Sequence, residues 1–290
     1  MALSIVEDLS EWMKDMLVSA NMHCLESVFD YSNDSVSTIA GQVAKTPQSW
    51  NGGIFSMIRG LSENVMMPIA GVILTIVMCI DLLHMIMDSN NMNTVDFWMI
   101  LKWIFKTAAA CLIVTNTWNI VMAVFEIAGS VVNSSSGVIS GSTAIQLSEV
   151  LPSVESRLEA MSVGELLITL LQSFVVSIGV RIMGIIIFIV INGRMIEIYL
   201  TTSIAPIPMA TMLGREWSGV GNGYLRSIFA LGFQGFFIMI CVGIYSVLIH
   251  SITTTADISY ALWTCLGYTV LLALSLIKTD SIAKGVFSAR

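Results

Sequence analysis

The sequence predicts an all-α, polytopic helical membrane protein with about five transmembrane helices, a broken or re-entrant Pro-containing segment and an amphipathic N-terminal helix. Of its 290 residues, 56% are hydrophobic and only 11% are charged, whereas soluble domains carry about 25% charged residues. The mean hydropathy is +0.83. Apolar runs of about 20 residues, the length that crosses a bilayer core, recur along the chain. We therefore expect a helical bundle whose solvent is lipid.

The N-terminal region, residues 1–64, is expected to begin with an amphipathic helix. Apolar residues recur at helical spacing from Leu3 to Ala20, and acidic residues together with Lys14 lie between them. The positively charged start and apolar core of a signal peptide are missing. Because the polar face is acidic, we expect the helix to contact protein in preference to a lipid surface. Asn51-Gly52-Gly53 predicts a turn before the first span.

Five apolar runs are long enough to cross the membrane. They comprise residues 65–87, 107–132, 166–191, 227–248 and 260–277. A sixth run, 195–213, contains Glu197 and the sequence Ala205-Pro206-Ile207-Pro208. Two prolines remove two backbone donors and stop a helix, and irregular backbone at membrane depth survives only where protein or water covers it. We expect this run to be broken or re-entrant, or to extend the preceding helix beyond the membrane.

The connections complete a bundle over residues 65–277. An outer loop, 133–164, is expected to hold a short polar helix after Pro152. A cytoplasmic loop, 214–226, contains Gly219, Gly221 and Gly223, which would make it adaptable. Residues 278–290 form a short cytoplasmic tail.

Lysines and arginines in the connections predict the orientation. With five spans, one side carries eight of them: Lys102, Lys106, Arg194, Arg215, Arg226, Lys278, Lys284 and Arg290. The other side carries four, in longer segments: Lys14, Lys45, Arg59 and Arg157. The positive-inside rule places the first set in the cytoplasm, so the N-terminus is expected outside and the C-terminus inside. A sixth span would move the N-terminus inside and divide the basic residues more evenly.

Composition and motifs also exclude several functions. A net charge of −7 argues against a basic nucleic-acid-binding surface, so DNA would be involved only as a translocated substrate. The chain has no P-loop and no H-E-x-x-H motif, and its five cysteines form no C-x-x-C pair. A serine intramembrane hydrolase, with Ser130 paired to His84 or His250, has no support from the sequence. We expect no enzyme activity, no cofactor and no metal site.

Four polar residues inside the spans are candidate functional residues, because charge at membrane depth is costly. They are Asp81, His84, Glu126 and Arg181. Asp81 and Arg181 lie at similar depths in their spans, so they are predicted to form an ion pair that fixes helix packing. The alternative is that Arg181 lines an aqueous cavity. Glu126 lies in the outer half of its span and is a poor partner for Arg181.

The region 201–247 has a more specific pattern. Thr201-Thr202-Ser203-Ile204-Ala205-Pro206-Ile207-Pro208 is followed by Arg215-Glu216-Trp217, by Tyr224-Leu225-Arg226-Ser227 and by Ala230-Leu231-Gly232-Phe233-Gln234-Gly235-Phe236-Phe237. This pattern resembles the TrbL-type conjugal transfer membrane proteins, particularly those of Gram-positive mobile elements. The candidate motif residues are Ala205, Pro206, Pro208, Trp217, Arg226, Gln234 and Gly235.

The resemblance implies a polytopic subunit of a conjugative type IV secretion machine in the cell membrane. Such a subunit would act as a channel or scaffold, form a homo-oligomer, contact lipid and other subunits including ATPases, and help to move DNA and protein across the membrane. Gly179, Gly184, Gly232, Gln234 and Gly235 are expected to allow close helix approach or hydrogen bonds in self-association. A secondary transporter of an unknown solute is the alternative, although no internal repeat supports it.

Overall fold

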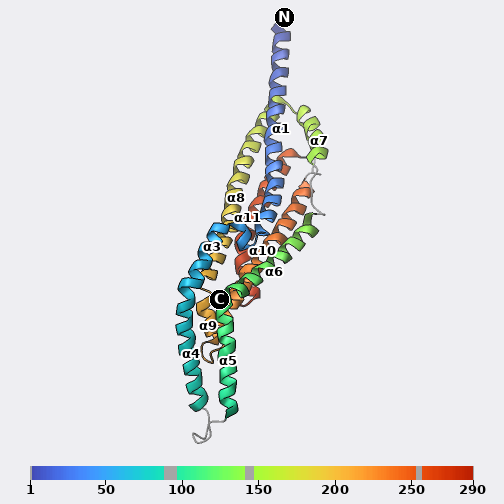
Figure 1. The fold of residues 1–290 in the computed structure, drawn as a ribbon. Helices are drawn as coiled ribbons and strands as arrows, with labels where there is room; N and C mark the ends of the chain where they lie inside the picture. The colour runs from blue at the N-terminus through green and yellow to red at the C-terminus, as the bar shows by residue number, and fades with distance from the viewer. Residues whose placement is uncertain (1, 88–96, 141–146, 253–256, 290) are drawn as a thin grey trace. The chain divides into compact units, whose positions relative to one another are not determined.

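The computed structural model describes residues 2–87, 97–140, 147–252 and 257–289, and these are helical apart from short turns (Figure 1). No strand occurs in the described ranges, which confirms the all-α prediction. The elements are α1 (Ala2–Val43), α2 (Pro47–Trp50), α3 (Gly52–Leu61), the π-helical turn η1 (Ser62–Met66), α4 (Met67–Met87), α5 (Phe97–Thr115), α6 (Thr117–Ser140), α7 (Leu147–Glu159), α8 (Val163–Ser203), α9 (Pro206–Thr211), α10 (Ser218–Ile252) and α11 (Ile258–Val286).

The chain divides into two compact units, each assembled from three separate stretches of sequence. Unit 1 comprises Met1–Val43, Asn133–Ile191 and Ile238–Lys278. Unit 2 comprises Ala44–Val132, Asn192–Phe237 and Thr279–Arg290. Helices α6, α8, α10 and α11 each contribute residues to both units.

In unit 1, the N-terminal helix α1 is anchored to α8 and α7. Leu25 and Val28 are buried on its inner face. The amide of buried Asn21 donates to the backbone carbonyl of Leu166 in α8 at 3.0 Å. Glycine at position 184 of α8 leaves the space that the Tyr31 side chain fills. The predicted helix therefore exists, and it contacts protein within its own unit.

Helix α7 replaces part of the predicted outer loop. It runs from Leu147 to Glu159 with Pro152 inside it, so the prediction that a helix begins after Pro152 is wrong. A proline removes one backbone hydrogen bond from a helix. Because Pro152 is exposed, water can reach the carbonyl that its ring leaves unbonded, and the helix continues through it. Helix α6 also extends into the loop, to Ser140.

In unit 2, a helical rod from Gly52 to Met87 begins at the predicted turn. Asn51 is extended, with φ −155°, and its side chain accepts hydrogen bonds from the N–H groups of Gly53 and Ile54 at 3.0 Å. An Asn in this position satisfies two of the unpaired donors of a helix start. Within the rod, η1 is a π-helical turn in which the N–H of Met67 donates to the carbonyl of Ser62.

Helices α5 and α6 follow one another with only Asn116 between them. The N–H of Asn116 donates to the carbonyl of Leu112 at 3.1 Å, and the carbonyl of Asn116 accepts from Ile120 at 3.0 Å. These i→i−4 bonds continue the helical ladder through the junction. The chain therefore does not reverse between the two helices, as Figure 1 also shows.

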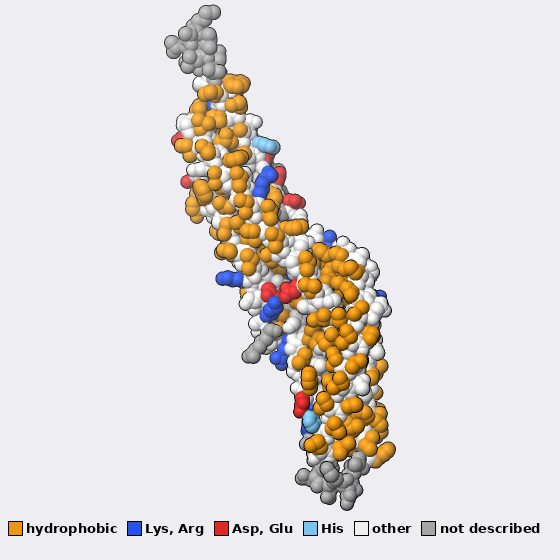
Figure 2. Space-filling model, turned by 90° about the vertical axis from the view of Figure 1, so that its left-hand side faces the viewer, with side chains coloured by type: hydrophobic (Ala, Val, Ile, Leu, Met, Phe, Trp, Pro, Cys, Tyr) orange, Lys and Arg blue, Asp and Glu red, His pale blue; other side chains and the backbone are white. Residues whose placement is uncertain are grey.

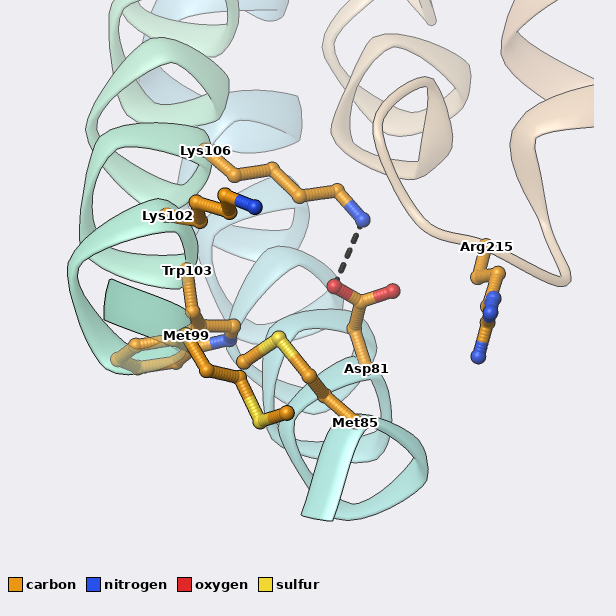
Figure 3. Close-up of a pocket in the computed structure, with 7 residues that line it drawn as sticks. All are labelled: Asp81, Met85, Met99, Lys102, Trp103, Lys106 and Arg215. Carbon is orange, nitrogen blue, oxygen red and sulfur yellow. Dashed lines mark hydrogen bonds and ion pairs between the residues drawn. The ribbon is translucent and has the colours of Figure 1, made fainter. Parts of the chain in front are cut away.

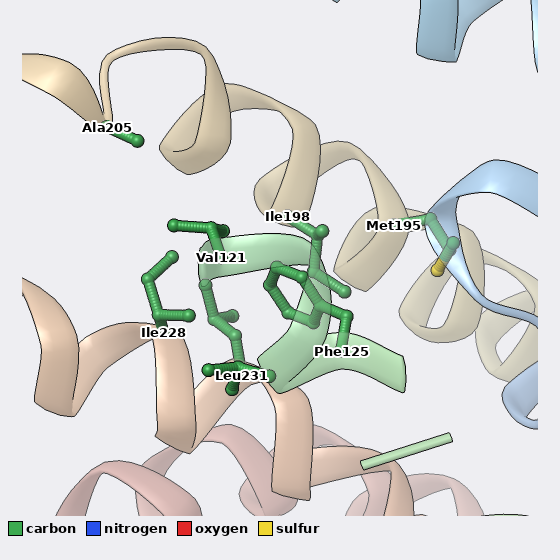
Figure 4. Packing of buried hydrophobic residues seen from close by; sticks show 8 residues of the cluster. Val121, Phe125, Met195, Ile198, Ala205, Ile228 and Leu231 are labelled. Atoms are coloured by element: carbon green, nitrogen blue, oxygen red, sulfur yellow. The ribbon is translucent and has the colours of Figure 1, made fainter. Parts of the chain in front are cut away.

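Three apolar clusters of described residues stabilise unit 2. One joins α6, α8 and α10 through Val121, Phe125, Ile198 and Leu231, among others (Figure 4). A second joins α4 to α5 and α9, and a third brings Ile58 against Trp118 and Tyr199. The Tyr199 hydroxyl also donates to the carbonyl of Pro47 at 2.6 Å. These contacts place the end of α8 against the start of the Gly52–Met87 rod.

The Pro-containing segment is broken, as predicted. Helix α8 ends at Ser203, and α9 follows as a helix of six residues, Pro206–Thr211. Pro206, Pro208 and Met209 are buried, and α9 packs against α4 and α5. Protein therefore covers the irregular backbone on both sides of α9, as an apolar surrounding requires.

Within the described part of the chain, six helices are long and apolar enough to cross a membrane. They are Gly52–Met87, Phe97–Thr115, Thr117–Val138, Val163–Ser203, Ser218–Ile252 and Ile258–Val286. Four of the five predicted spans lie inside one such helix, whereas the predicted span 107–132 is divided at Asn116. The additional candidate is Phe97–Thr115 and not the run 195–213. Helix α8 extends beyond its predicted run past Arg194, and α11 extends past Lys278, because charged residues end a hydropathy window without ending a helix.

Half or fewer of the residues in each apolar window are buried. Only 11% of the apolar window in Phe97–Thr115 is buried, and the most buried window, in Ser218–Ile252, reaches 50%. Figure 2 shows hydrophobic side chains covering much of the visible face. An exposed surface of this kind is expected where lipid or another membrane subunit covers it.

Gly221 is expected to be essential for packing α10 against α9. A Cβ at Gly221 would lie 2.7 Å from both the Met212 Cα and the Pro208 carbonyl oxygen. We expect Gly221→Ala to lower the free energy of unfolding by about 1–3 kcal/mol, because backbone must move. Gly219→Ala is the matched control, since its Cβ would meet nothing within 4 Å. Thermal unfolding of the detergent-purified variants measures the difference, and equal midpoints would contradict this packing.

Candidate functional site

Asp81 is a buried carboxylate in unit 2 that forms an ion pair with Lys106. Its side chain is 7% exposed, and Lys106 Nζ donates to Asp81 Oδ2 at 2.7 Å. Asp81 lies on α4 and Lys106 on α5, so the pair joins the two helices. Trp103 strengthens the same contact by donating its Nε1–H to the carbonyl of Met78 at 3.1 Å.

The predicted pairing of Asp81 with Arg181 is wrong, because each has another partner in its own unit. Arg181 is exposed on α8 in unit 1, and its Nη2 donates to Ser27 Oγ on α1 at 3.2 Å. Depth along a span does not specify which way a side chain faces. Lys106 was counted as a loop residue, although α5 begins before it at Phe97.

The Asp81–Lys106 pair lies in a pocket of about 330 Å³ (Figure 3). Its lining comprises Asp81, Met85, Met99, Lys102, Trp103, Lys106 and Arg215. Figure 3 shows Lys102 and Lys106 projecting from α5, with Arg215 on the opposite wall. Arg215 comes from the turn between α9 and α10. Three cationic side chains and one carboxylate thus line the described part of this pocket.

His84 and Glu126, two further candidate residues of the sequence analysis, are not among the described residues that line the pocket. His84 is one turn beyond Asp81 on α4, and its Nε2 is 3.4 Å from Glu216 Oε1, beside Arg215 in sequence. Glu126 is exposed on α6. His84 therefore belongs to the contact between α4 and the turn after α9, whereas nothing in the described structure connects Glu126 with that contact.

The motif residues fall in three different settings of unit 2. Ala205, Pro206 and Pro208 are buried in and beside α9. Trp217 and Arg226 are exposed at the start of α10. Gln234, which is 4% exposed, and Gly235 face other helices from the middle of α10. Because α10 begins at Ser218, residues 218–226 of the predicted loop 214–226 are helical.

Arg194 is a buried cation that the sequence analysis placed in a cytoplasmic connection. It lies on α8 and is 7% exposed. Its Nε donates to the carbonyl of Leu231 and its Nη2 to that of Gly232, both at 3.2 Å. A Cβ at Gly235 would lie 2.9 Å from Nη2, so glycine leaves room for the guanidinium. The ion pairs of the described residues do not include Arg194.

The glycine at position 235 indicates close packing of α10, but the sequence pattern does not show that Arg194 is the residue packed against it. Glycine inside a helix costs stability relative to alanine, and here it makes room for an arginine from another helix. Gln234 beside it donates to Thr279 Oγ1 of α11 at 3.4 Å. Close by along α8 and α11, Lys284 Nζ lies 3.2 Å from Glu197 Oε1 and 2.8 Å from Asp280 Oδ2. Helices α8, α10 and α11 thus share a polar layer in unit 2.

Two of the small residues expected in self-association are occupied within unit 1. A Cβ at Gly179 would lie 2.7 Å from the Leu266 side chain, and Gly184 faces Tyr31. In unit 2, Gly232 lies against Ala128, and Gln234 and Gly235 have the partners given above. Each of these residues thus serves packing inside the chain, and self-association of the protein stays a prediction.

The membrane-length helices, the covered break at α9 and the exposed apolar surface define a polytopic, all-α membrane protein. Its residues 32–206 match the family described as TrbL/VirB6 plasmid conjugal transfer like protein. The match covers more than half of the chain, so the protein belongs to this family. It is accordingly a multi-pass membrane component of a conjugal transfer complex, in which it contacts other subunits.

The family match confirms the predicted family, although most of the residues that suggested the family lie outside the matched region. The matched region ends at Pro206, so Pro208, Trp217, Arg226, Gln234 and Gly235 lie beyond it. Most of the motif that suggested the family is therefore outside the part of the chain that matches. Comparison with curated proteins and with solved structures returns no match.

The Asp81–Lys106 pair is expected to show strong coupling. Lys106→Met leaves a buried carboxylate without its cation and should lower the free energy of unfolding by about 1–3 kcal/mol, less than for a fully buried pair because Lys106 is 35% exposed. The double variant Asp81→Asn/Lys106→Met should recover most of this loss. Thermal unfolding of both single variants and the double variant measures the coupling. Additive losses would show that the pair contributes nothing.

Gly235 and Arg194 are expected to be coupled in the same way. Gly235→Ala should lower the free energy of unfolding by about 1–3 kcal/mol because the guanidinium must leave the carbonyls it binds. Gly193→Ala, beside Arg194 but with open space at its Cβ, is the control. In an Arg194→Met background, Gly235→Ala should cost much less. A loss of the same size in both backgrounds would exclude the guanidinium as its cause.

Proposed function

We propose that this protein is a membrane channel or scaffold subunit of a conjugative type IV secretion machine and helps to transfer DNA and protein across the cell membrane. The observation that carries the proposal is the family match over residues 32–206. The broken helix α9, enclosed by α4 and α5, supports it by providing a defined polytopic core. The protein is not an enzyme in this proposal, so partner ATPases supply the energy.

Self-association is part of the same proposal. The small residues on α8 and α10 are used inside the chain, so contact between copies would involve the outward apolar side chains. On α8 these include Leu171, Phe174, Ile185 and Phe188, which are 57–67% exposed. A homo-oligomer would cover part of this surface, and lipid would cover the rest.

The proposed function is tested by deleting the gene from a donor strain and supplying it again in trans. Transfer frequency should fall to background on deletion and return with the wild-type gene. A membrane-localised Gly221→Ala variant should restore less transfer than Gly219→Ala. If deletion leaves transfer unchanged but abolishes uptake of a solute, the protein is a secondary transporter and the proposal is overturned.

The transmembrane topology gives a second prediction. Because the helical ladder continues through Asn116, we expect five crossings, with the N-terminus outside and the C-terminus inside. In a cysteine-free background, a cysteine at Ser37 should react with an impermeant reagent in intact cells, and one at Ser281 only after permeabilisation. A cysteine at Asn116 should resist labelling from both sides. Rapid labelling at Asn116 would instead support separate crossings by α5 and α6.

A further inference from the structure

The pocket around Asp81 is lined by both cationic and apolar side chains, a combination that can bind an anionic group carried by an apolar molecule. Lys102 and Lys106 are four residues apart on α5, so they lie on one face of the helix. Arg215 adds a third cation from the opposite wall. Asp81 is the only carboxylate among the described lining residues, and one carboxylate balances one cation. Because Asp81 is paired with Lys106, Lys102 adds a positive charge that this carboxylate does not balance.

Lys102 and Lys106 are arranged so that they can still bind a ligand. Lys102 is exposed, and its described contact is with the Trp98 ring, whose centroid lies 6.0 Å from Nζ. Lys106 holds Asp81 with one of the three N–H donors of its ammonium. A phosphate oxygen could accept from both ammonium groups without displacing Asp81.

The surroundings of the pocket are apolar. Met85, Met99 and Trp103 form its remaining walls, and the Trp103 ring is fixed by its hydrogen bond to α4. Large exposed side chains occur within about two turns of the pocket on the same two helices: Leu83 58%, Met87 71%, Phe97 75%, Trp98 57% and Phe105 68%. Tryptophan beside lysine at the end of a membrane helix is typical of the headgroup level of a bilayer.

We propose that this pocket binds the phosphate of an anionic phospholipid, whose acyl chains lie along the exposed apolar surface of α4 and α5. Basic pockets between membrane helices bind anionic headgroups in this way. The volume of about 330 Å³ lies at the lower end of the range for ligand pockets, about 300–1,000 Å³. An acidic protein segment would use the same cations but not the apolar surface. The proposal concerns lipid recognition and stands apart from the role in transfer.

The test uses the full-length protein in detergent, with bound lipids counted by native mass spectrometry and thermal unfolding measured in parallel. Dioleoylphosphatidylglycerol should bind and raise the unfolding midpoint, whereas dioleoylphosphatidylcholine should not. Lys102→Gln should weaken phosphatidylglycerol binding by about tenfold, as for the loss of one charge-assisted hydrogen bond. Lys45→Gln removes the same charge from an exposed position outside the pocket and should have no effect.

Four results would overturn the proposal. Equal binding by both lipids would show that headgroup charge is not recognised, and equal binding by the Lys102 and Lys45 variants would place the lipid elsewhere. Stabilisation by inorganic phosphate alone, lost in Lys102→Gln, would indicate a free-phosphate site. Stabilisation by a hexaglutamate peptide, without preference between the lipids, would indicate an acidic protein partner. Lys102→Arg should retain phosphatidylglycerol binding, which separates loss of charge from loss of fold.

Discussion

The enclosure of α9 by α4 and α5 is the constraint on which unit 2 depends. A six-residue helix that begins at Pro206 cannot satisfy its backbone alone, because its start leaves N–H groups unpaired and its end leaves carbonyls unpaired. Neighbouring protein must cover those groups. The close approach of Gly214 to Val77 and of Gly221 to Met212 follows from this requirement. The turn after α9 then brings Arg215 and Glu216 to the level of Asp81 and His84.

Charge in unit 2 is accommodated in two different ways. Asp81 has a cation from the adjacent helix, and its ion pair remains partly open to solvent through Lys106. Arg194 has backbone carbonyls in place of a carboxylate. Guanidinium suits the second arrangement because its donors are spread over a planar group and it is more weakly hydrated than an ammonium. A lysine at position 194 could not reach both carbonyls with the same geometry.

The sequence was sufficient for the fold class, the family, the N-terminal helix, the turn at Asn51 and the break at Pro206. Each has a local cause, such as composition, periodicity or missing backbone donors. The partners of Asp81, Arg181 and Arg194 depend on the rotation of one helix against another. Helices such as α8 and α10 are apolar on nearly all sides, so periodicity does not indicate which face is buried. The true ends of the helices were also missed, because hydropathy ends at Lys106 or Arg194 while the backbone ladder continues.

The π-helical turn η1 sets the rotational phase of the rod from Gly52 to Met87. Met57, Leu61, Val65 and Ile69 are all exposed and recur at every fourth residue. An uninterrupted α-helix advances about 100° per residue, so it would carry Ile69 about 120° away from Met57. The wider turn at Ser62–Met66 absorbs about one residue of that rotation. The outward stripe of α3 consequently continues on the same side of α4, while the opposite side remains available to α5 and α9.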